Sequence, residues 1–375
     1  MEYKNARAEV FTFSNSTEVS EAHVMIHITD TTLTYQEQLK AVNEALIQLQ
    51  SNELKGYEAV FMRYYLSDAA NQADELHAST TATNCAISII EQPPLDGTKI
   101  ALWAYLMTGM QPVSTDNGLH AIRHSEFIHL WNGSAHNLAA NSEQQASLLL
   151  NDYIAQLEKA DCTLADNCIR TWFFVNDIDL NYGGVVRARN QVFFTQGLTN
   201  ETHFIASTGI GGRQADQNVL VQMDSYAIAG IRPEQIHHLY APTHLNRTSD
   251  YGVSFERGTY IDYADRRHVF ISGTASINNK GHIVHPKDVV KQATRMIENV
   301  EVLLAEADCT ASDIGQIIIY LRDIADYSVM NDIIARRFLG KPYVIVHAPV
   351  CRPGWLIEME CMAVKKQKLP QLPTF

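Results

Sequence analysis

The sequence of 375 residues predicts an α+β fold made of two tandem units, each a mixed sheet with helices packed on one face. Two observations lead to this prediction. A short segment recurs in the two halves of the chain, and the same order of helical and extended patterns surrounds each copy. The composition agrees, because 46% hydrophobic and 19% charged residues are typical of a compact chain and not of a disordered one.

The repeated segment reads ADCTxxD and occupies residues 160–166 and 307–313. Each copy lies within the same series of expected elements. These are a helix, a strand, a second helix and a closing strand, at 142–160, 172–175, 185–196 and 219–228 in the first copy and at 289–303, 317–321, 328–340 and 355–364 in the second. A repeat of this length indicates a duplicated domain and not a stacked array of short repeats.

We place the boundary between the units near residue 230. Residues 1–230 then form a diverged first unit with an N-terminal extension, and residues 231–375 form the second unit. The first part of the chain also shows a helical pattern at 35–50 and strand patterns at 98–107 and 126–131. No low-complexity linker separates the units, so we expect them to pack tightly.

The charge balance narrows the classes of ligand. With 29 Lys and Arg against 42 Asp and Glu, the net charge of −13 opposes binding to nucleic acid or to an anionic membrane surface, and local arginines must hold any anionic ligand. The chain shows no secretory h-region and no apolar run of spanning length, which predicts a cytoplasmic protein. Its six cysteines form no CxxC pair and are expected to be reduced.

The closing strand of the second unit carries the main candidate site. Glu358 and Glu360 alternate with apolar residues, so both carboxylates lie on one face of the strand. Their repulsion and partial burial raise the pKa of at least one of them, as a general acid requires. The first copy has Gln222 and Asp224 at the matching positions, which suggests that only the second unit keeps the site. A carboxylate on a solvated face is the simpler alternative.

Other candidates are weaker. Cys351 is either a reactive thiol beside the exposed turn CRPG or a small buried apolar residue. The segment STGIGG at 207–212 lacks the spacing of a phosphate loop, and we interpret it as a turn. Arg187 and Arg189 lie on different faces of a helix, so at most one should point into a given pocket. Two pairs of histidines have spacings that a metal could use but no third ligand, and we expect neither metal nor cofactor.

The second unit resembles the Rid (YjgF-like) family of reactive-intermediate deaminases, from VFISGTASINNKGHIVHP at residue 269 to WLIEMECMAV at 355–364. Further segments, in order KIALWAYLM, FIHLW, RTWFFVNDI, ARNQVF, TSDYGVSFERG and FISGTASI, together with the spacing from Cys351 to Glu358, resemble the chorismatases. These enzymes have a diverged Rid-like unit before a second one. The resemblance spans roughly residues 98 to 365.

The resemblance implies an enzyme that hydrolyses or eliminates the enolpyruvyl ether of chorismate, giving pyruvate and a dihydroxycyclohexadiene or hydroxybenzoate acid. Glu358 would protonate the enol ether, and Cys351 would help to select the product. The substrate is a dianion, so arginines would bind its carboxylates. The implied substrate-binding residues are Arg257, Arg187 or Arg189, Tyr251, Gly273, Thr274 and Ala275, with Glu360 beside the acid.

Two alternatives remain. A Rid-type imine or enamine deaminase would need an arginine after the proline of KPYVIVH, where this chain has Tyr343. A non-catalytic module that binds a small carboxylated metabolite would show the same asymmetry between Glu358 and Gln222. The chain departs from the family pattern at Gly258 in SFERG and in the turn CRPGW. Because of these departures the resemblance does not predict which ring product is formed. Rid-like domains commonly trimerise, so the chain is expected to be a monomer or a homotrimer.

Overall fold

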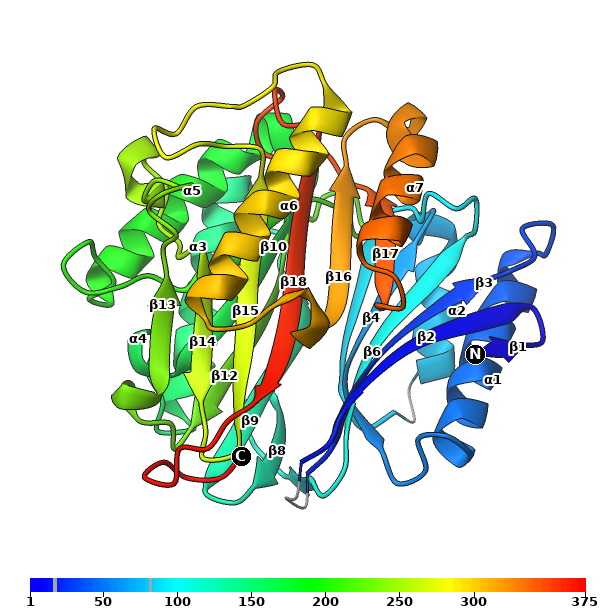
Figure 1. Cartoon of the computed structure of the whole chain (residues 1–375), viewed down its shortest axis with the longest axis horizontal. Helices are drawn as coiled ribbons and strands as arrows, with labels where there is room; N and C mark the ends of the chain where they lie inside the picture. The colour runs from blue at the N-terminus through cyan, green and yellow to red at the C-terminus, as the bar shows by residue number, and fades with distance from the viewer. Residues whose placement is uncertain (16–18, 81–82) are drawn as a thin grey trace.

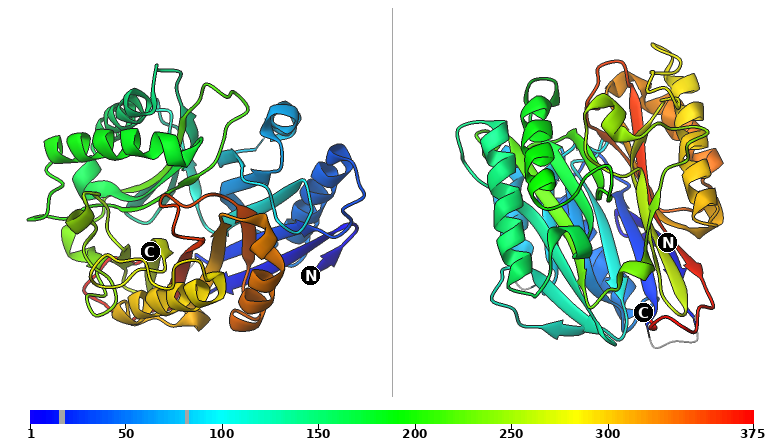
Figure 2. Two further views of the ribbon diagram at one scale, coloured as in Figure 1. Left: turned by 90° about the horizontal axis from the view of Figure 1, so that it is seen from above. Right: turned by 90° about the vertical axis from the view of Figure 1, so that its left-hand side faces the viewer.

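The computed structural model describes residues 1–15, 19–80 and 83–375. Three mixed sheets of six strands each surround a common axis, and their helices cover the outer faces (Figure 1; Figure 2, left). Each sheet has the same strand order, in which the closing strand lies between the third and fourth strands of its unit. The chain therefore contains the same α+β unit three times.

The first sheet and its helices come from residues 2–107. Its elements are β1 (Glu2–Tyr3), β2 (Ala6–Phe13), β3 (Glu21–Ile28), α1 (Tyr35–Ser51), β4 (Glu58–Leu66), α2 (Ala69–Thr80), β5 (Ala86–Glu91) and β6 (Ile100–Met107).

The second sheet follows directly. Its elements are β7 (Gln111–Val113), β8 (His120–His124), β9 (Phe127–His136), α3 (Ser142–Glu158), α4 (Leu164–Asn167), β10 (Cys168–Val175), α5 (Ile178–Thr195), β11 (Ala206–Gly211) and β12 (Val221–Ala229).

The third sheet begins after η1 (Pro233–Gln235). Its elements are β13 (Ile236–Leu239), η2 (Thr248–Tyr251), β14 (Gly258–Asp262), β15 (Arg266–Ala275), α6 (Val289–Glu306), η3 (Ala311–Asp313), β16 (Ile314–Leu321), η4 (Ile324–Asp326), α7 (Tyr327–Arg337), β17 (Tyr343–His347) and β18 (Ile357–Lys366). None of the helices among the described residues is long and apolar enough to cross a membrane.

The predicted α+β class is confirmed. The two copies of the repeated segment belong to the second and third sheets, so the chain has three units where the sequence predicted two. The N-terminal extension is itself a sheet with the same strand order, which the sequence did not reveal. The ADCTxxD segment explains why. Asp161 and Asp308 both end a helix with φ of 54°, and the side chains of Thr163 and Thr310 cap the next turn. After α1 the chain has no such segment, so its unit left no recognisable repeat.

The prediction for residues 207–212 is wrong. The segment STGIGG, interpreted as a turn, forms most of β11, which pairs in parallel with β10. Its equivalent in the third unit is β17, not the CRPG turn. A Cβ at Gly209 would lie 2.6 Å from the ring of Tyr182 on α5, so a larger residue there would displace that ring.

The strand register shows which residues are equivalent. Ile100, Val221 and Ile357 each pair with the last residue of the neighbouring strand. One residue further along, Ala101, Gln222 and Glu358 therefore occupy the same position in the three units, as the sequence overlay of the second and third units predicted. Only the third unit has a carboxylate there.

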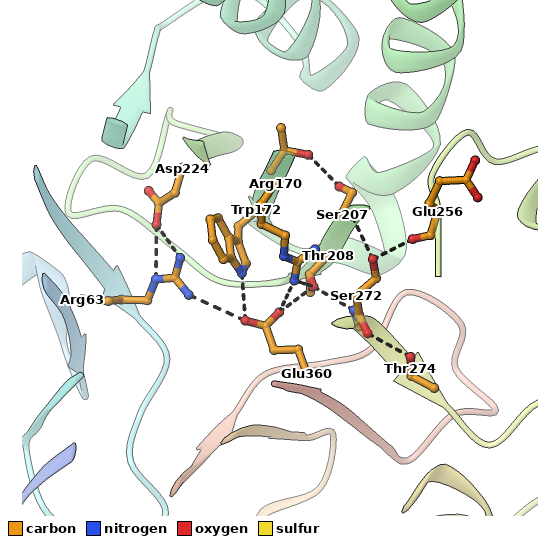
Figure 3. Close-up of polar contacts among 12 residues, drawn as sticks. Arg63, Arg170, Trp172, Ser207, Thr208, Asp224, Glu256, Ser272, Thr274 and Glu360 are labelled. Atoms are coloured by element: carbon orange, nitrogen blue, oxygen red, sulfur yellow. Dashed lines mark hydrogen bonds and ion pairs between the residues drawn. The ribbon is translucent and has the colours of Figure 1, made fainter. Parts of the chain in front are cut away.

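Buried ion pairs join the three sheets at the axis (Figure 3). Glu360 of β18 accepts hydrogen bonds from Arg170 Nη2 (2.9 Å) and Trp172 Nε1 (2.8 Å), both on β10. Arg63 of β4 pairs with Asp224 of β12 at 2.8 Å and lies 3.9 Å from Glu360. Removing one partner of such a pair would leave a buried charge, so the network holds the sheets in a fixed arrangement.

Candidate active site

A cavity of about 410 Å³ lies between the second and third units. The second unit contributes α5 and β11, and the third contributes the 240–257 loop, β15 and the segment from Cys351 to Glu358. The residues that line it are Tyr182, Gly183, Val186, Arg187, Arg189, Ser207, Gly209, Tyr251, Gly252, Val253, Phe255, Arg257, Gly273, Ala275, Ile277, Cys351, Arg352, Trp355 and Glu358. Arginine and aromatic side chains surround a single carboxyl group.

Hydrogen bonds between the units fix the walls of this cavity. The Ser207 N–H donates to Ser272 Oγ (2.9 Å), whose hydroxyl donates to the Glu256 carbonyl (2.6 Å), as Figure 3 shows. On the other side, the Asn190 side chain of α5 donates to the Gly252 carbonyl (2.9 Å) and accepts from Ser254 Oγ (2.8 Å). Asn190 therefore attaches the 240–257 loop to α5.

Glu358 is the buried carboxyl group of the cavity, with 5% of its surface exposed. It pairs with Ala275 on β15 and Tyr320 on β16, and its Oε1 atom lies over Gly273, where any Cβ would clash with it. Burial raises the pKa of Glu358 to about 8, and the charge of Glu360 adds to the rise. The carboxyl makes no hydrogen bond with any described residue, and its raised pKa favours the protonated form at pH 7.

Arg189 lines the same cavity with its guanidinium fully buried and without an anionic partner among the described residues. None of its three nitrogens makes a well-aligned hydrogen bond within the described part of the chain, although its charge acts on the nearby Tyr182 hydroxyl. Its Cζ lies 5.9 Å and 5.7 Å from the ring centres of Phe173 and Phe255. A buried cation without hydrogen bonds is costly. An anion bound in the cavity would offset this cost.

Arg257 is a second buried guanidinium, with 4% of its surface exposed. Its Nε and Nη2 atoms donate to Asn246 at 3.0–3.2 Å, which holds the side chain in place. The Tyr251 hydroxyl also interacts with this guanidinium, because Arg257 opposes the rise in the pKa of Tyr251. Arg257 also opposes the rise in the pKa of Glu358, which shows that its charge acts on the carboxyl group.

Cys351 lines the cavity, and burial raises the pKa of its thiol to about 12, with Glu358 adding to the rise. The thiol is therefore neutral at physiological pH. It can donate a weak hydrogen bond or shape the cavity, but it is not a thiolate nucleophile.

Tyr251, Gly273 and Ala275 line the cavity as well, whereas two predicted residues do not. The hydroxyl of Thr274 donates to the Ser272 carbonyl (2.8 Å), and Glu360 belongs to the ion-pair network at the axis.

The expectation that at most one of Arg187 and Arg189 reaches the cavity is wrong. Arg189 is buried, and the long side chain of Arg187 reaches the rim, where it pairs with Glu143 at 2.8 Å. Helical spacing alone does not account for the reach of such a side chain.

Sequence reasoning also missed several lining residues. Arg352 and Trp355 flank the proline and glycine of the CRPGW turn, and Tyr182 and Phe255 come from α5 and from the loop before β14. An arginine and a tryptophan close to Cys351 were a usable signal.

The equivalent position in the second unit is closed. Gln222 is buried and accepts a hydrogen bond from Gln214 (2.9 Å) while donating to Ser134 Oγ (3.3 Å). Ala101 offers no polar group at this position in the first unit. The chain therefore keeps this carboxyl group at one of three related positions.

Comparisons with known proteins agree with this organisation. The family model described as Endoribonuclease L-PSP matches residues 256–365. A RutC family protein of Pyrococcus abyssi is 30% identical over 100 residues, which cover 26% of this chain and 79% of the relative. The chain belongs to the Rid superfamily, which includes these RutC and L-PSP proteins.

Similarity also extends beyond the third unit of this Rid protein. A 3-hydroxybenzoate synthase of Streptomyces hygroscopicus is 27% identical over 232 residues, covering 56% of this chain and 66% of the relative. A solved chorismatase structure superposes with a TM-score of 0.64 at 17% identity, covering 82% of this chain and 93% of that structure. The protein is thus a chorismatase-like member of the Rid superfamily, and the fold is shared over most of its length.

Proposed function

We propose that this protein is an enzyme that cleaves the enolpyruvyl ether of chorismate, releasing pyruvate. One observation carries the proposal: the buried carboxyl group of Glu358, whose pKa is raised to about 8, shares a cavity with the unpaired guanidinium of Arg189 and the partly unpaired one of Arg257. Such a cavity suits a substrate that has two carboxylates and a carbon atom to be protonated.

Glu358 acts as the general acid. Transfer of its proton to the methylene carbon of the enol ether produces an oxocarbenium ion and leaves Glu358 as a carboxylate. Addition of water to this ion gives a hemiketal, which collapses to pyruvate and the dihydroxycyclohexadiene acid, and the released proton returns to Glu358. Loss of one water molecule from this ring then gives the hydroxybenzoate. Protonating a carbon requires an acid that is not ionised near pH 7, which the raised pKa of Glu358 supplies.

Arg189 and Arg257 bind the two carboxylates. The guanidinium is planar and suits bidentate recognition of a carboxylate, and inside a cavity these contacts are strong. Their charges also counteract the repulsion that a protein of net charge −13 exerts on a dianion.

Cys351 contributes to the choice of product. The similarity to a 3-hydroxybenzoate synthase favours a hydroxybenzoate over a dihydroxycyclohexadiene acid. As a neutral thiol close to Glu358, Cys351 acts by contact with the ring intermediate and not as an anionic nucleophile.

The deaminase alternative receives less support. Tyr343, at the position of the expected deaminase arginine, lies on β17 outside the cavity and donates its hydroxyl proton to Asn331 (3.0 Å). The carboxylate clamp of that reaction has no counterpart there.

The test is to incubate the purified protein with chorismate, measure pyruvate and separate the ring products by chromatography. Pyruvate together with 3-hydroxybenzoate is the expected outcome. A folded protein that releases no pyruvate from chorismate, but ammonia from 2-iminoacids, would overturn the proposal in favour of the deaminase.

A further inference from the structure

Arg352 lies in the turn after Cys351 and is partly exposed at the rim of the cavity. Its guanidinium carbon lies 4.5 Å from the ring centre of Tyr251 and 4.7 Å from that of Trp355. Two aromatic rings thus hold the side chain, while the N–H groups at the edge of its guanidinium plane stay available.

The charge of Arg352 is not compensated. Its guanidinium makes no hydrogen bond or ion pair with any residue in the described ranges 1–15, 19–80 and 83–375. Arg187, the other arginine at the rim, differs in this respect, since it pairs with Glu143 at 2.8 Å. Arg352 is therefore the rim arginine whose donors are free for a ligand.

Tyr251 connects this rim arginine to the interior. Its ring lies 5.6 Å from the Arg257 guanidinium carbon and 4.5 Å from that of Arg352. The buried Arg257 and the partly exposed Arg352 therefore both contact the ring of Tyr251. An anion bound to Arg352 is then close to Arg257.

We propose that Arg352 captures the anionic substrate at the mouth of the cavity and guides it inward to Arg257. This inference rests on the proposed function. A protein of net charge −13 repels an approaching dianion. An unpaired cation at the mouth of the cavity attracts the dianion at the point where it enters. Arg352 acts on substrate binding and not on the proton transfer.

The test uses the full chain with three substitutions. Arg352→Gln removes the charge, Arg352→Lys keeps the charge without the planar stack, and Arg123→Gln is the control. Arg123 is exposed on β8, near the edge of the second sheet opposite to β11, so its loss changes the net charge equally but far from the cavity. For each variant, kcat and KM for chorismate are measured between low and high ionic strength.

Arg352→Gln should raise KM about tenfold at low salt and leave kcat within about twofold, and kcat/KM should fall less steeply with salt than in the wild type. Arg352→Lys should keep the salt dependence of the wild type, and Arg123→Gln should match the wild type throughout. An unchanged KM and salt dependence in Arg352→Gln, or a loss confined to kcat, would overturn the inference.

A binding measurement separates this inference from the proposed function. In the Glu358→Gln background chorismate should stay intact, so its dissociation constant can be measured by calorimetry with and without Arg352→Gln. If the wild type neither turns over nor binds chorismate, the proposed function fails. If it does both and Arg352→Gln binds equally well, only the role of Arg352 fails.

Discussion

The buried Glu358 carboxyl makes the stability of this protein depend on pH in a way that one substitution removes. Its pKa is about 8 in the folded protein against 4.5 for the ordinary side chain, so between these values the folded state binds more protons than the unfolded state. The contribution of this carboxyl group to the free energy of unfolding is fully present below pH 4.5 and is lost as the pH rises to 8. The difference of about 3.5 between the pKa values corresponds to about 5 kcal/mol.

Glutamine cannot ionise, so Glu358→Gln removes this loss while almost preserving the size of the side chain. We expect the free energy of unfolding of the variant, minus that of the wild type, to rise by about 5 kcal/mol between pH 4.5 and pH 9. Denaturant unfolding of both proteins in parallel at each pH measures this difference, and other titrating groups cancel in the subtraction. A difference that stays constant with pH would refute the reasoning, because it would mean that Glu358 is ionised when folded.

Three further substitutions test the walls of the cavity. Gly273→Ala should reduce kcat about 100-fold with little effect on folding, because the new Cβ displaces the Glu358 carboxyl; an unchanged kcat would contradict the placement of that group. Arg189→Met should raise the denaturant midpoint, since it removes an unpaired buried charge, while calorimetry detects no chorismate binding; binding at wild-type affinity would exclude Arg189 as a ligand. Asn190→Ala should raise KM about threefold to tenfold, because the 240–257 loop loses two hydrogen bonds to α5, whereas an equal KM would show that the loop is held by other contacts.

Much of the third unit was predictable from local pattern. The alternation in the closing strand placed Glu358 and Glu360 on one face, and the repeat identified Gln222 as the equivalent of Glu358. These inferences succeed because strand alternation and helix periodicity are local properties of the chain.

The first unit and half of the cavity were harder to predict from the sequence. The first unit shares strand order with the others but not the ADCTxxD segment, so its similarity exists only in three dimensions. The unpaired state of Arg189 depends on how α5 packs against the third unit, which no local pattern encodes. For the same reason the different fates of Glu358 and Glu360 became visible only once Arg170 and Trp172 were placed around one of them.

The most direct test of the central claim is pyruvate release from chorismate by the wild type and by Glu358→Gln between pH 6 and pH 9. If Glu358 is the general acid, wild-type kcat/KM is nearly constant below pH 7 and approaches a tenfold fall per pH unit above pH 8, and the variant is about 100-fold to 10,000-fold slower at pH 7. A variant as active as the wild type, or a wild-type rate that does not fall up to pH 9, would contradict it.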